Sequence, residues 1–387
     1  MPRALIAWEM GGGLGHAVRV TGIARVLAEA GWQVLVAGRD ADTLARVSRD
    51  AALALIAAPH PPMAGIPPAA GLHSMWDTLL RAGYGATDEL VRTMARWAEL
   101  VRACGAEIVI ADFSPALGLW ARGRLPLLQA SHGYLLPPPG CGEDMPDLLP
   151  DARARVLSAM ERASARHGAP PPTTLADLSR GDGEAVTTLA LFDPFDAERA
   201  APALGPLEEL PRPVAPASDG IFCYFDAGHP AASSLLEALE LCGRPVEIYL
   251  RGAPAEWQAW LESRPGFRAH RRPAPLHEAL ARNAVAVSYG SLGLAQATLS
   301  AGRPHLILPM RNSREQMLNA ERLRLLGLAR ILPADAGRMR IGEALEDLAG
   351  RQETRRHALL VAETFGPETS RSCLPAILEM AERLRAA

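Results

Sequence analysis

Residues 285–332 read VAVSYGSLGLAQATLSAGRPHLILPMRNSREQMLNAERLRLLGLARIL, and this stretch decides the fold. An apolar run at Val285–Val287 precedes the glycine turn Tyr289–Gly293, and a second apolar run follows at His305–Leu308. Between them, small and apolar residues recur at helical spacing: Leu294, Ala297, Thr298 and Ala301. The order strand, glycine turn, helix and strand predicts a parallel sheet covered by helices.

The glycine turn has a chemical consequence. Where a strand passes through such a turn into a helix, unpaired backbone N–H groups and the positive end of the helix dipole lie together, and they suit a phosphate. The polar loop Arg311–Gln316 follows the next strand. Successive strand ends of a parallel sheet face the same crevice. We therefore expect this loop to reach whatever the turn binds.

Three pieces of this stretch resemble the donor-sugar signature of family 1 nucleotide-sugar glycosyltransferases of the GT-B fold. They are VSYGSLG at 287–293, AGRP at 301–304 and EQ-x-x-NA-x-RL at 315–323. In that family the glycine turn and helix start hold the diphosphate, and the acidic residue and glutamine bind sugar hydroxyls. The donor-binding residues that the resemblance implies in this stretch are Tyr289, Gly290, Ser291, Gly293, Glu315, Gln316 and Asn319, and Gly15 near the N-terminus is another. Tyr289 stands where the family normally has a histidine, and Ser291 replaces the second glycine.

Bulk properties narrow the class of protein. A chain of 387 residues predicts roughly two domains. The net charge of −3 implies no nucleic-acid partner. The 5 cysteines form no C-x-x-C pair, which fits a reducing compartment. No apolar run approaches the roughly 20 residues of a membrane span, and the chain opens in a strand without a signal peptide. We expect a cytoplasmic enzyme without a transmembrane segment.

The N-terminal part begins with a βαβ unit. An apolar strand at Ala4–Trp8 leads into the glycine turn GGGLGH at 11–16. A helix at Val18–Ala30 and a strand at Gln33–Ala37 follow.

Three interpretations compete for this turn. A dinucleotide fingerprint, G-x-G-x-x-G, would need glycine where His16 stands, although Asp40 after the second strand is a partial match. A tight turn with a surface histidine is the second interpretation. The third is that Gly15-His16 resembles the N-terminal turn of GT-B transferases, whose histidine is the general base. We favour the third because the donor signature occurs downstream.

Asp112 is the expected partner of His16. It ends a buried-type strand, EIVIA at 107–111. A histidine base benefits from a carboxylate on its other ring nitrogen, and in the resembling family an aspartate at the matching strand end supplies it. The alternative is that Asp112 caps the helix that starts near Pro115.

The acceptor side carries weaker signals. Pro59–Tyr84 is rich in proline and glycine and predicts either a functional loop or a disordered surface loop. If functional, Trp76 and Tyr84 would line an acceptor pocket. His132, after a strand at Leu125–Ala130, is either a second acceptor-side group or a structural turn residue.

The proline-rich segment Ala201–Ala217 marks a domain boundary. We divide the chain into an acceptor-binding domain (1–205), a linker (206–217), a nucleotide-sugar domain (218–365) and a last helix (366–387) that returns to the first domain. The C-terminal tail of the chain would start with one helix at Gly342–Ala362.

The second domain opens with a strand at Ile221–Phe225 and a turn at Asp226–Pro230. The resemblance implies that Gly228 helps to hold the phosphates, and His229 could partly replace the histidine that is missing at Tyr289. Arg272 lies where the family usually stacks the nucleobase, and its guanidinium could stack there instead.

The resemblance implies an α/β protein with two facing, doubly wound Rossmann-like domains and an interdomain cleft. It further implies inverting, metal-independent sugar transfer from a UDP or dTDP sugar, with His16 and Asp112 as the catalytic pair. The nucleotide sugar would be a co-substrate, no cofactor is expected, and the acceptor would be a small or lipid-linked molecule. One alternative is a nucleotide-sugar hydrolase or epimerase. Another is a non-catalytic helper protein, which is favoured by the presence of Tyr289 where the family normally has a histidine. Acceptor, sugar, nucleobase and oligomeric state are not encoded in these motifs.

Overall fold

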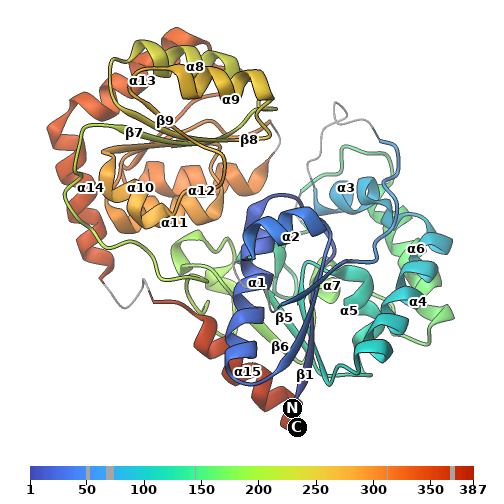
Figure 1. The fold of residues 1–387 in the computed structure, drawn as a ribbon. Coiled ribbons are helices and arrows are strands. Elements are labelled where there is room, and N and C mark those ends of the chain that lie inside the picture. The colour runs from blue at the N-terminus through green and yellow to red at the C-terminus, as the bar shows by residue number, and fades with distance from the viewer. Residues whose placement is uncertain (49–52, 67–73, 144, 312, 367–370) are drawn as a thin grey trace. The chain divides into compact units, whose positions relative to one another are not determined.

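The computed structural model describes residues 1–48, 53–66, 74–143, 145–311, 313–366 and 371–387. The chain divides into two compact units (Figure 1). The N-terminal unit comprises Met1–Glu208 together with Ser372–Ala387, and the C-terminal unit comprises Glu209–Arg371. Within the described ranges, each unit is built on a 6-stranded sheet whose paired strands are parallel. The predicted α/β class, with two doubly wound sheets, is confirmed.

The N-terminal sheet has the order β3-β2-β1-β4-β5-β6. Its strands are β1 (Arg3–Trp8), β2 (Gln33–Gly38), β3 (Ala54–Ala57), β4 (Ile108–Asp112), β5 (Leu127–Ser131) and β6 (Gly183–Val186). Its longer helices are α1 (Leu14–Glu29), α2 (Ala41–Val47), α4 (Thr87–Cys104), α5 (Pro115–Ala121), α6 (Ala152–Arg166) and α15 (Leu374–Ala386). Its short helical segments are α3 (Met75–Leu79), η2 (Leu80–Tyr84), η3 (Gly133–Leu135), α7 (Leu175–Leu178), η4 (Ala190–Phe192) and η5 (Asp196–Glu198).

Both faces of this sheet are buried, as the uninterrupted apolar run of β1 requires. Ala4, Ile6 and Trp8 pack in the cluster that includes α1 and α15. Leu5 and Ala7 point the other way, into the cluster that includes α4, α5 and α6. This alternation is the two-residue period of a strand. Parallel pairing of β1 with β4 places Trp8 opposite Asp112, at the carboxyl edge of the sheet.

The C-terminal sheet has the order β12-β11-β10-β7-β8-β9. Its strands are β7 (Ile221–Asp226), β8 (Val246–Arg251), β9 (Phe267–His270), β10 (Val285–Ser288), β11 (His305–Ile307) and β12 (Ala329–Ile331). Its helices are α8 (Ala232–Leu241), α9 (Ala255–Ser263), α10 (Leu276–Arg282), α11 (Leu292–Ala301), α12 (Arg314–Leu325), α13 (Arg338–Gly350) and α14 (Gln352–Phe365). The β7 side chains Ile221, Cys223 and Phe225 face the cluster of α8 and α13, and Phe222 faces that of α10 and α11.

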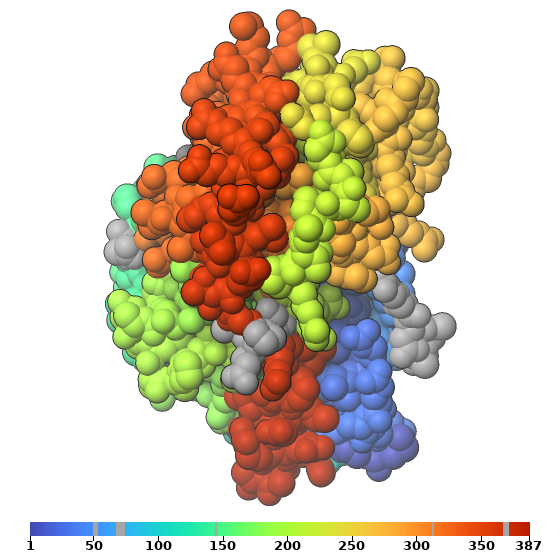
Figure 2. Space-filling model, turned by 90° about the vertical axis from the view of Figure 1, so that its left-hand side faces the viewer, coloured from blue at the N-terminus to red at the C-terminus, as the bar shows by residue number. Residues whose placement is uncertain are grey.

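The segment that leads into β7 lies on the C-terminal unit, beside α14 (yellow-green and orange-red in Figure 2). Two side chains from this unit hold it. Ser300 Oγ donates to the carbonyl of Pro211 at 2.7 Å, and Arg303 Nη2 donates to that of Val214 at 2.8 Å. Arg303 is 1% exposed and donates to backbone carbonyls through its other nitrogens as well. It therefore holds the segment that leads into β7 in one position.

Two expectations about local structure were wrong. The single helix expected at 342–362 is two helices, α13 and α14, separated by Arg351 in extended conformation. The segment expected to be one loop from Pro59 to Tyr84 ends in the helical turns α3 and η2, where Ser74 and Asp77 form a capping box. Positions 67–73 of that segment lie outside the described residues.

Candidate active site

His16 lies in the first turn of α1, at the carboxyl edge of the N-terminal sheet. The chain reaches it through Gly11 and Gly13, whose φ angles are 87° and 101°, a region that glycine adopts without strain. Gly11 has a second reason to be glycine, because a Cβ there would collide with Nε2 of His16. The glycine turn thus brings backbone against one edge of the imidazole. Gly15, the neighbouring predicted site residue, is exposed.

Asp112, at the end of β4, binds the other edge of the ring. His16 Nδ1 lies 2.8 Å from Asp112 Oδ2, and the two side chains are 11% and 1% exposed. An ionised carboxylate only accepts hydrogen bonds, so Nδ1 carries the proton and Nε2 of the neutral ring holds the lone pair. Among the described residues, Nε2 has no hydrogen-bond partner. The geometry therefore leaves the lone pair of one ring nitrogen unsatisfied among the described residues.

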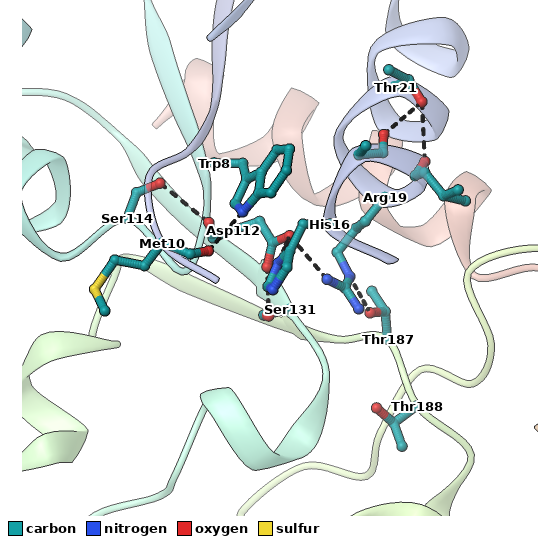
Figure 3. A network of polar contacts seen from close by, with 12 residues as sticks. Trp8, Met10, His16, Arg19, Thr21, Asp112, Ser114, Ser131, Thr187 and Thr188 are labelled. Carbon is teal, nitrogen blue, oxygen red and sulfur yellow. Dashed lines mark hydrogen bonds and ion pairs between the residues drawn. The ribbon is translucent and has the colours of Figure 1, made fainter. Parts of the chain in front are cut away.

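Three donors converge on Asp112 (Figure 3). Besides His16, Arg19 Nη1 donates to Oδ2 at 2.9 Å and Ser131 Oγ donates to Oδ1 at 2.6 Å. Burial raises the pKa of Asp112, but the charges of Arg19 and His16 and the hydrogen bonds outweigh it and hold that pKa below its ordinary range. Asp112 is therefore ionised at neutral pH.

The alternative role for Asp112, capping α5, is wrong. The N-cap of α5 is Ser114, and the first N–H groups of the helix donate elsewhere. Ala116 and Leu117 donate to Oε2 of Glu9, at 3.1 and 3.3 Å. Glu9 follows β1 and is fully buried, and this burial raises its pKa to about 7, although its hydrogen bonds pull the other way.

Aromatic rings enclose the imidazole. Trp8 stacks on His16 with a ring centroid distance of 5.4 Å and an interplanar angle of 10°, and Phe113 lies at 6.4 Å and 19°. Trp8 is fixed in turn by donating its Nε1–H to the carbonyl of Met10 at 2.6 Å. Phe113 has φ of 45°, a strained value for a residue with a large side chain. These contacts fix the plane of the histidine ring.

Both aromatic residues that we predicted to line an acceptor pocket belong to the core. Tyr84 is 0% exposed, and its hydroxyl donates to Oε1 of Glu9 at 2.6 Å. Trp76 is 2% exposed and donates its Nε1–H to Glu143 at 3.0 Å. Having almost no surface, these side chains support the N-terminal unit and offer no wall to a ligand.

His132 lies close to His16, at a ring centroid distance of 6.4 Å. It is 6% exposed and precedes the short helix η3. Burial, followed by the positive charges of Arg19 and His16, holds the pKa of His132 well below its ordinary value. A neutral imidazole therefore lies beside His16, and its role toward an acceptor stays a prediction.

In the C-terminal unit, hydrogen bonds to the backbone of Gly290 hold the glycine turn after β10. Gly290 has φ of 89°, and a Cβ there would lie 3.0 Å from the carbonyl oxygen of Gln316. The backbone N–H of Gly290 donates to Ser288 Oγ at 2.9 Å, and its carbonyl accepts from Asn319 Nδ2 at 3.1 Å. Asn319, a predicted donor-binding residue, is 2% exposed and serves here to join α12 to the turn.

Beyond the turn, Ser291 is the N-cap of α11 and its side chain makes no capping hydrogen bond. Gly293, in the first turn of α11, is exposed. The first N–H groups of a helix have no partner within it, so this end of α11 keeps the donor character that the sequence predicts.

Tyr289 packs within a group of aromatic side chains on neighbouring strands. Its ring centroid lies 6.2 Å from those of Tyr224 and Phe225, and Tyr224 lies 5.3 Å from Tyr249. Tyr224 and Tyr289 are hydrogen-bonded, and burial raises the pKa of both, so they are neutral. Arg251 and Asp226, at the ends of β8 and β7, form an ion pair at this edge of the sheet.

The suggestion that His229 replaces a diphosphate-binding histidine is wrong. His229 is 3% exposed and uses both ring nitrogens inside the unit. Its Nε2 donates to the carbonyl of Leu308 at 3.0 Å, and its Nδ1 accepts from the N–H of Ala231 at 3.1 Å. No donor is left for a phosphate. Gly228 beside it is exposed and donates its N–H to Asp226 at 2.8 Å.

The remaining predicted donor residues lie in loops and at helix starts. The side-chain oxygen of Gln316 accepts from the N–H of Met310 at 2.8 Å, which closes the loop between β11 and α12. Glu315 is half-buried in the first turn of α12, and its charge acts on Tyr289. Arg272 is exposed between β9 and α10. The sugar and nucleobase contacts of these residues stay predictions.

No family model and no curated protein matches the chain. Its likeness is to solved structures. The calicheamicin glycosyltransferase CalG4 has a TM-score of 0.71 at 18% identity, covering 100% of this chain and 98% of that one. Glycosyltransferase VinC in complex with dTDP has 0.66 at 17%, covering 99% of each chain. Spinosyn rhamnosyltransferase SpnG with spinosyn aglycone has 0.66 at 16%, covering 97% and 99%.

The chain has the GT-B fold. The resemblance that the sequence suggested is thus confirmed at the level of the fold. In the part of this GT-B chain that the structure describes, no three His, Cys, Asp or Glu side chains gather as metal ligands would. No described helix combines the length and apolar character that crossing a membrane would require.

Sequence reasoning missed several residues of the His16 site. They are Trp8, Arg19, Phe113, Ser131 and Thr187. One of them had a local signal, because Arg19 follows His16 by three positions on a predicted helix and so shares its face. Strand order pairs β4 with β5 and β5 with β6, which makes Ser131 a neighbour of Asp112 and Thr187 a neighbour of Ser131.

Proposed function

We propose that this protein is an inverting glycosyltransferase that moves a sugar from a nucleoside diphosphate sugar to a hydroxyl group of a small acceptor. The observation that carries the proposal is the state of His16. Its Nδ1 is bound by a buried carboxylate, and its Nε2 has no hydrogen-bond partner among the described residues. A neutral, oriented imidazole of this kind is suited to take a proton from a hydroxyl group.

In the proposed reaction, Nε2 of His16 accepts the hydroxyl proton of the acceptor as its oxygen bonds to the anomeric carbon. The bond from that carbon to the diphosphate breaks, and the diphosphate leaves with the electron pair. Asp112 stays ionised and stabilises the imidazolium that forms, since Arg19 and Ser131 bind it throughout. Attack from the face opposite the leaving group inverts the anomeric centre.

The C-terminal unit would hold the donor. The start of α11 offers N–H groups to the diphosphate, and Asn319 and Ser288 fix the turn that precedes it. Tyr289 presents a neutral hydroxyl group in place of a histidine, and the ion pair of Arg251 with Asp226 lies nearby. Glu315 would bind sugar hydroxyls. These assignments rest on the backbone geometry of the turn and on the resemblance at residues 287–323.

The neighbours suggest the chemical class of both substrates. VinC is in complex with dTDP, and SpnG with spinosyn aglycone. We therefore propose a dTDP sugar, with a UDP sugar as the second choice, and a small hydroxyl-bearing aglycone as acceptor.

Donor consumption tests the proposal. Purified protein is incubated with dTDP and UDP sugars, with and without a panel of hydroxyl-bearing aglycones, and release of nucleoside diphosphate is followed. We expect release that depends on the acceptor, with a glycosylated product of inverted configuration. Release without an acceptor would instead identify a hydrolase, and isomerised donor an epimerase. Donor binding without any turnover would identify a non-catalytic helper.

A further inference from the structure

Arg19 is a charged residue in the His16 site, and its part in the proposed reaction goes beyond binding Asp112. It lies on α1, one turn after His16, and its side chain is 7% exposed. Its guanidinium is held at two points. Nη1 donates to Asp112 Oδ2 at 2.9 Å, and Nε donates to Thr187 Oγ1 at 3.0 Å (Figure 3). Thr187, directly after β6, is 2% exposed. Two fixed contacts give this arginine one orientation.

Arg19 and His16 share a single carboxylate oxygen. Both donate to Oδ2 of Asp112, while Ser131 occupies Oδ1. A histidine paired with a lone buried carboxylate gains strongly from being protonated, because an ion pair then forms. Here Arg19 already neutralises the carboxylate. The cluster is neutral when His16 is neutral and carries a positive charge when His16 is protonated.

The other groups that face His16 do not change this balance. Among the described residues, the charged or titratable ones are Asp112 from β4, Arg19 from α1 and His132 after β5. His132 is kept neutral by its burial and by the charge of Arg19. Trp8, Phe113 and Gly11 also contact the ring, and they carry no charge.

We propose that Arg19 is a positioning residue that keeps Asp112 ionised and oriented, and thereby keeps His16 unprotonated and ready to accept a proton at neutral pH. A carboxylate alone would orient the imidazole equally well, but it would also favour the protonated ring, which cannot act as a base. Arg19 therefore moves the working range of the site toward lower pH. This inference rests on the proposed role of His16 as general base.

The test is a histidine titration by NMR, because it does not depend on turnover. The protein has 10 histidines, and the His16 signal is assigned by its loss in His16→Gln. We expect the titration midpoint of that signal to lie roughly one pH unit higher in Arg19→Gln than in the wild type, as expected when a neighbouring like charge is removed. An unchanged midpoint in Arg19→Gln would overturn the proposal.

Two further variants separate charge from packing. Arg19→Lys keeps the charge but cannot reproduce both contacts of the planar guanidinium, so its midpoint should stay near that of the wild type. Arg199→Gln removes another buried arginine of the same unit, which pairs with Asp193 instead of Asp112. It should cost stability without moving the midpoint. If Arg199→Gln moves the midpoint as far as Arg19→Gln does, the effect is a general loosening of the unit and the proposal fails.

Turnover adds a readout that separates this inference from the proposed function. The acid side of the kcat/KM profile in Arg19→Gln should move to higher pH in step with the NMR midpoint, while KM for the donor stays within about twofold. A shifted midpoint in a protein that transfers no sugar would refute the proposed function and leave the role of Arg19 standing. Active enzyme with equal profiles in wild type and Arg19→Gln would refute the role of Arg19 alone.

Discussion

In each unit, a glycine–histidine pair follows the first strand, and the two histidines differ in how many of their ring nitrogens are hydrogen-bonded. Gly15-His16 follows β1, and its imidazole keeps one nitrogen without a partner among the described residues. Gly228-His229 follows β7, and both nitrogens of its imidazole are hydrogen-bonded to backbone groups of the same unit. The same two residue types after the same kind of strand thus give an imidazole with one nitrogen that no described residue binds in one unit, and an imidazole with both nitrogens bound in the other.

The difference comes from the neighbours. At the first turn, the adjacent strand β4 ends in an ionised carboxylate that occupies only Nδ1. At the second, the adjacent backbone supplies an acceptor at Leu308 and a donor at Ala231. Whether a histidine keeps one nitrogen without a partner therefore depends on what the neighbouring strands carry at their ends.

The largest effect should come from His16→Ala. Removing the proposed base should lower turnover by roughly two or more orders of magnitude, the scale of general-base catalysis. Donor affinity should be nearly unchanged, because the donor is proposed to bind the other unit. Turnover is measured with saturating donor and acceptor, and His277→Ala, which removes a histidine with 70% side-chain exposure, is the control. Wild-type rates in His16→Ala would remove His16 from the mechanism.

His229→Ala should act on stability instead. It leaves the buried carbonyl of Leu308 and N–H of Ala231 without partners, which should cost roughly 2 kcal/mol or more of unfolding free energy. His16→Ala should cost less, since Asp112 keeps Arg19 and Ser131 as donors. Chemical denaturation followed by circular dichroism compares the two. Equal losses of stability would contradict the contrast between the two histidines.

The comparison also shows how far the sequence leads. Glycine turns, apolar runs and helical spacing predicted the central strands and the two-unit fold, because these patterns are local. The pairing of His16 with Asp112 followed from the position of Asp112 at a strand end and from the family resemblance. Tyr84 and His229 were misassigned because burial decides their roles, and burial depends on residues distant in sequence, such as Glu9 and Leu308.

Glu9 offers a smaller test, in the same unit as His16. Burial raises its pKa from 4.5 to about 7, so the folded protein holds a proton there that the unfolded chain releases. The stability from protonated Glu9 is complete below the unfolded value and is lost as pH rises through the folded one. Between about pH 6 and 8, unfolding free energy should fall by about 1 kcal/mol more in the wild type than in Glu9→Gln. Denaturation curves that shift in parallel with pH would contradict this.

The smallest effect concerns the donor edge of the C-terminal unit. If Glu315 binds sugar hydroxyls, Glu315→Ala should weaken binding of the nucleotide sugar about fivefold more than binding of the free nucleoside diphosphate, the scale of one lost hydrogen bond. Calorimetry measures both affinities. Glu321→Ala, in the same helix and ion-paired with Arg324, is the control. Equal weakening for both ligands would mean that Glu315 does not touch the sugar.

The path of the chain through the two units has a consequence for synthesis. The C-terminal unit is one continuous segment, whereas the N-terminal unit lacks α15 until residues 374–386 are made. Ile377 and Ala381 of that helix are 0% exposed and pack with α1 against the first sheet. On the ribosome, the half that is translated later can therefore finish its core first. A nascent chain that stalls before residue 374 would carry a complete C-terminal unit and an N-terminal unit with an exposed, aggregation-prone core.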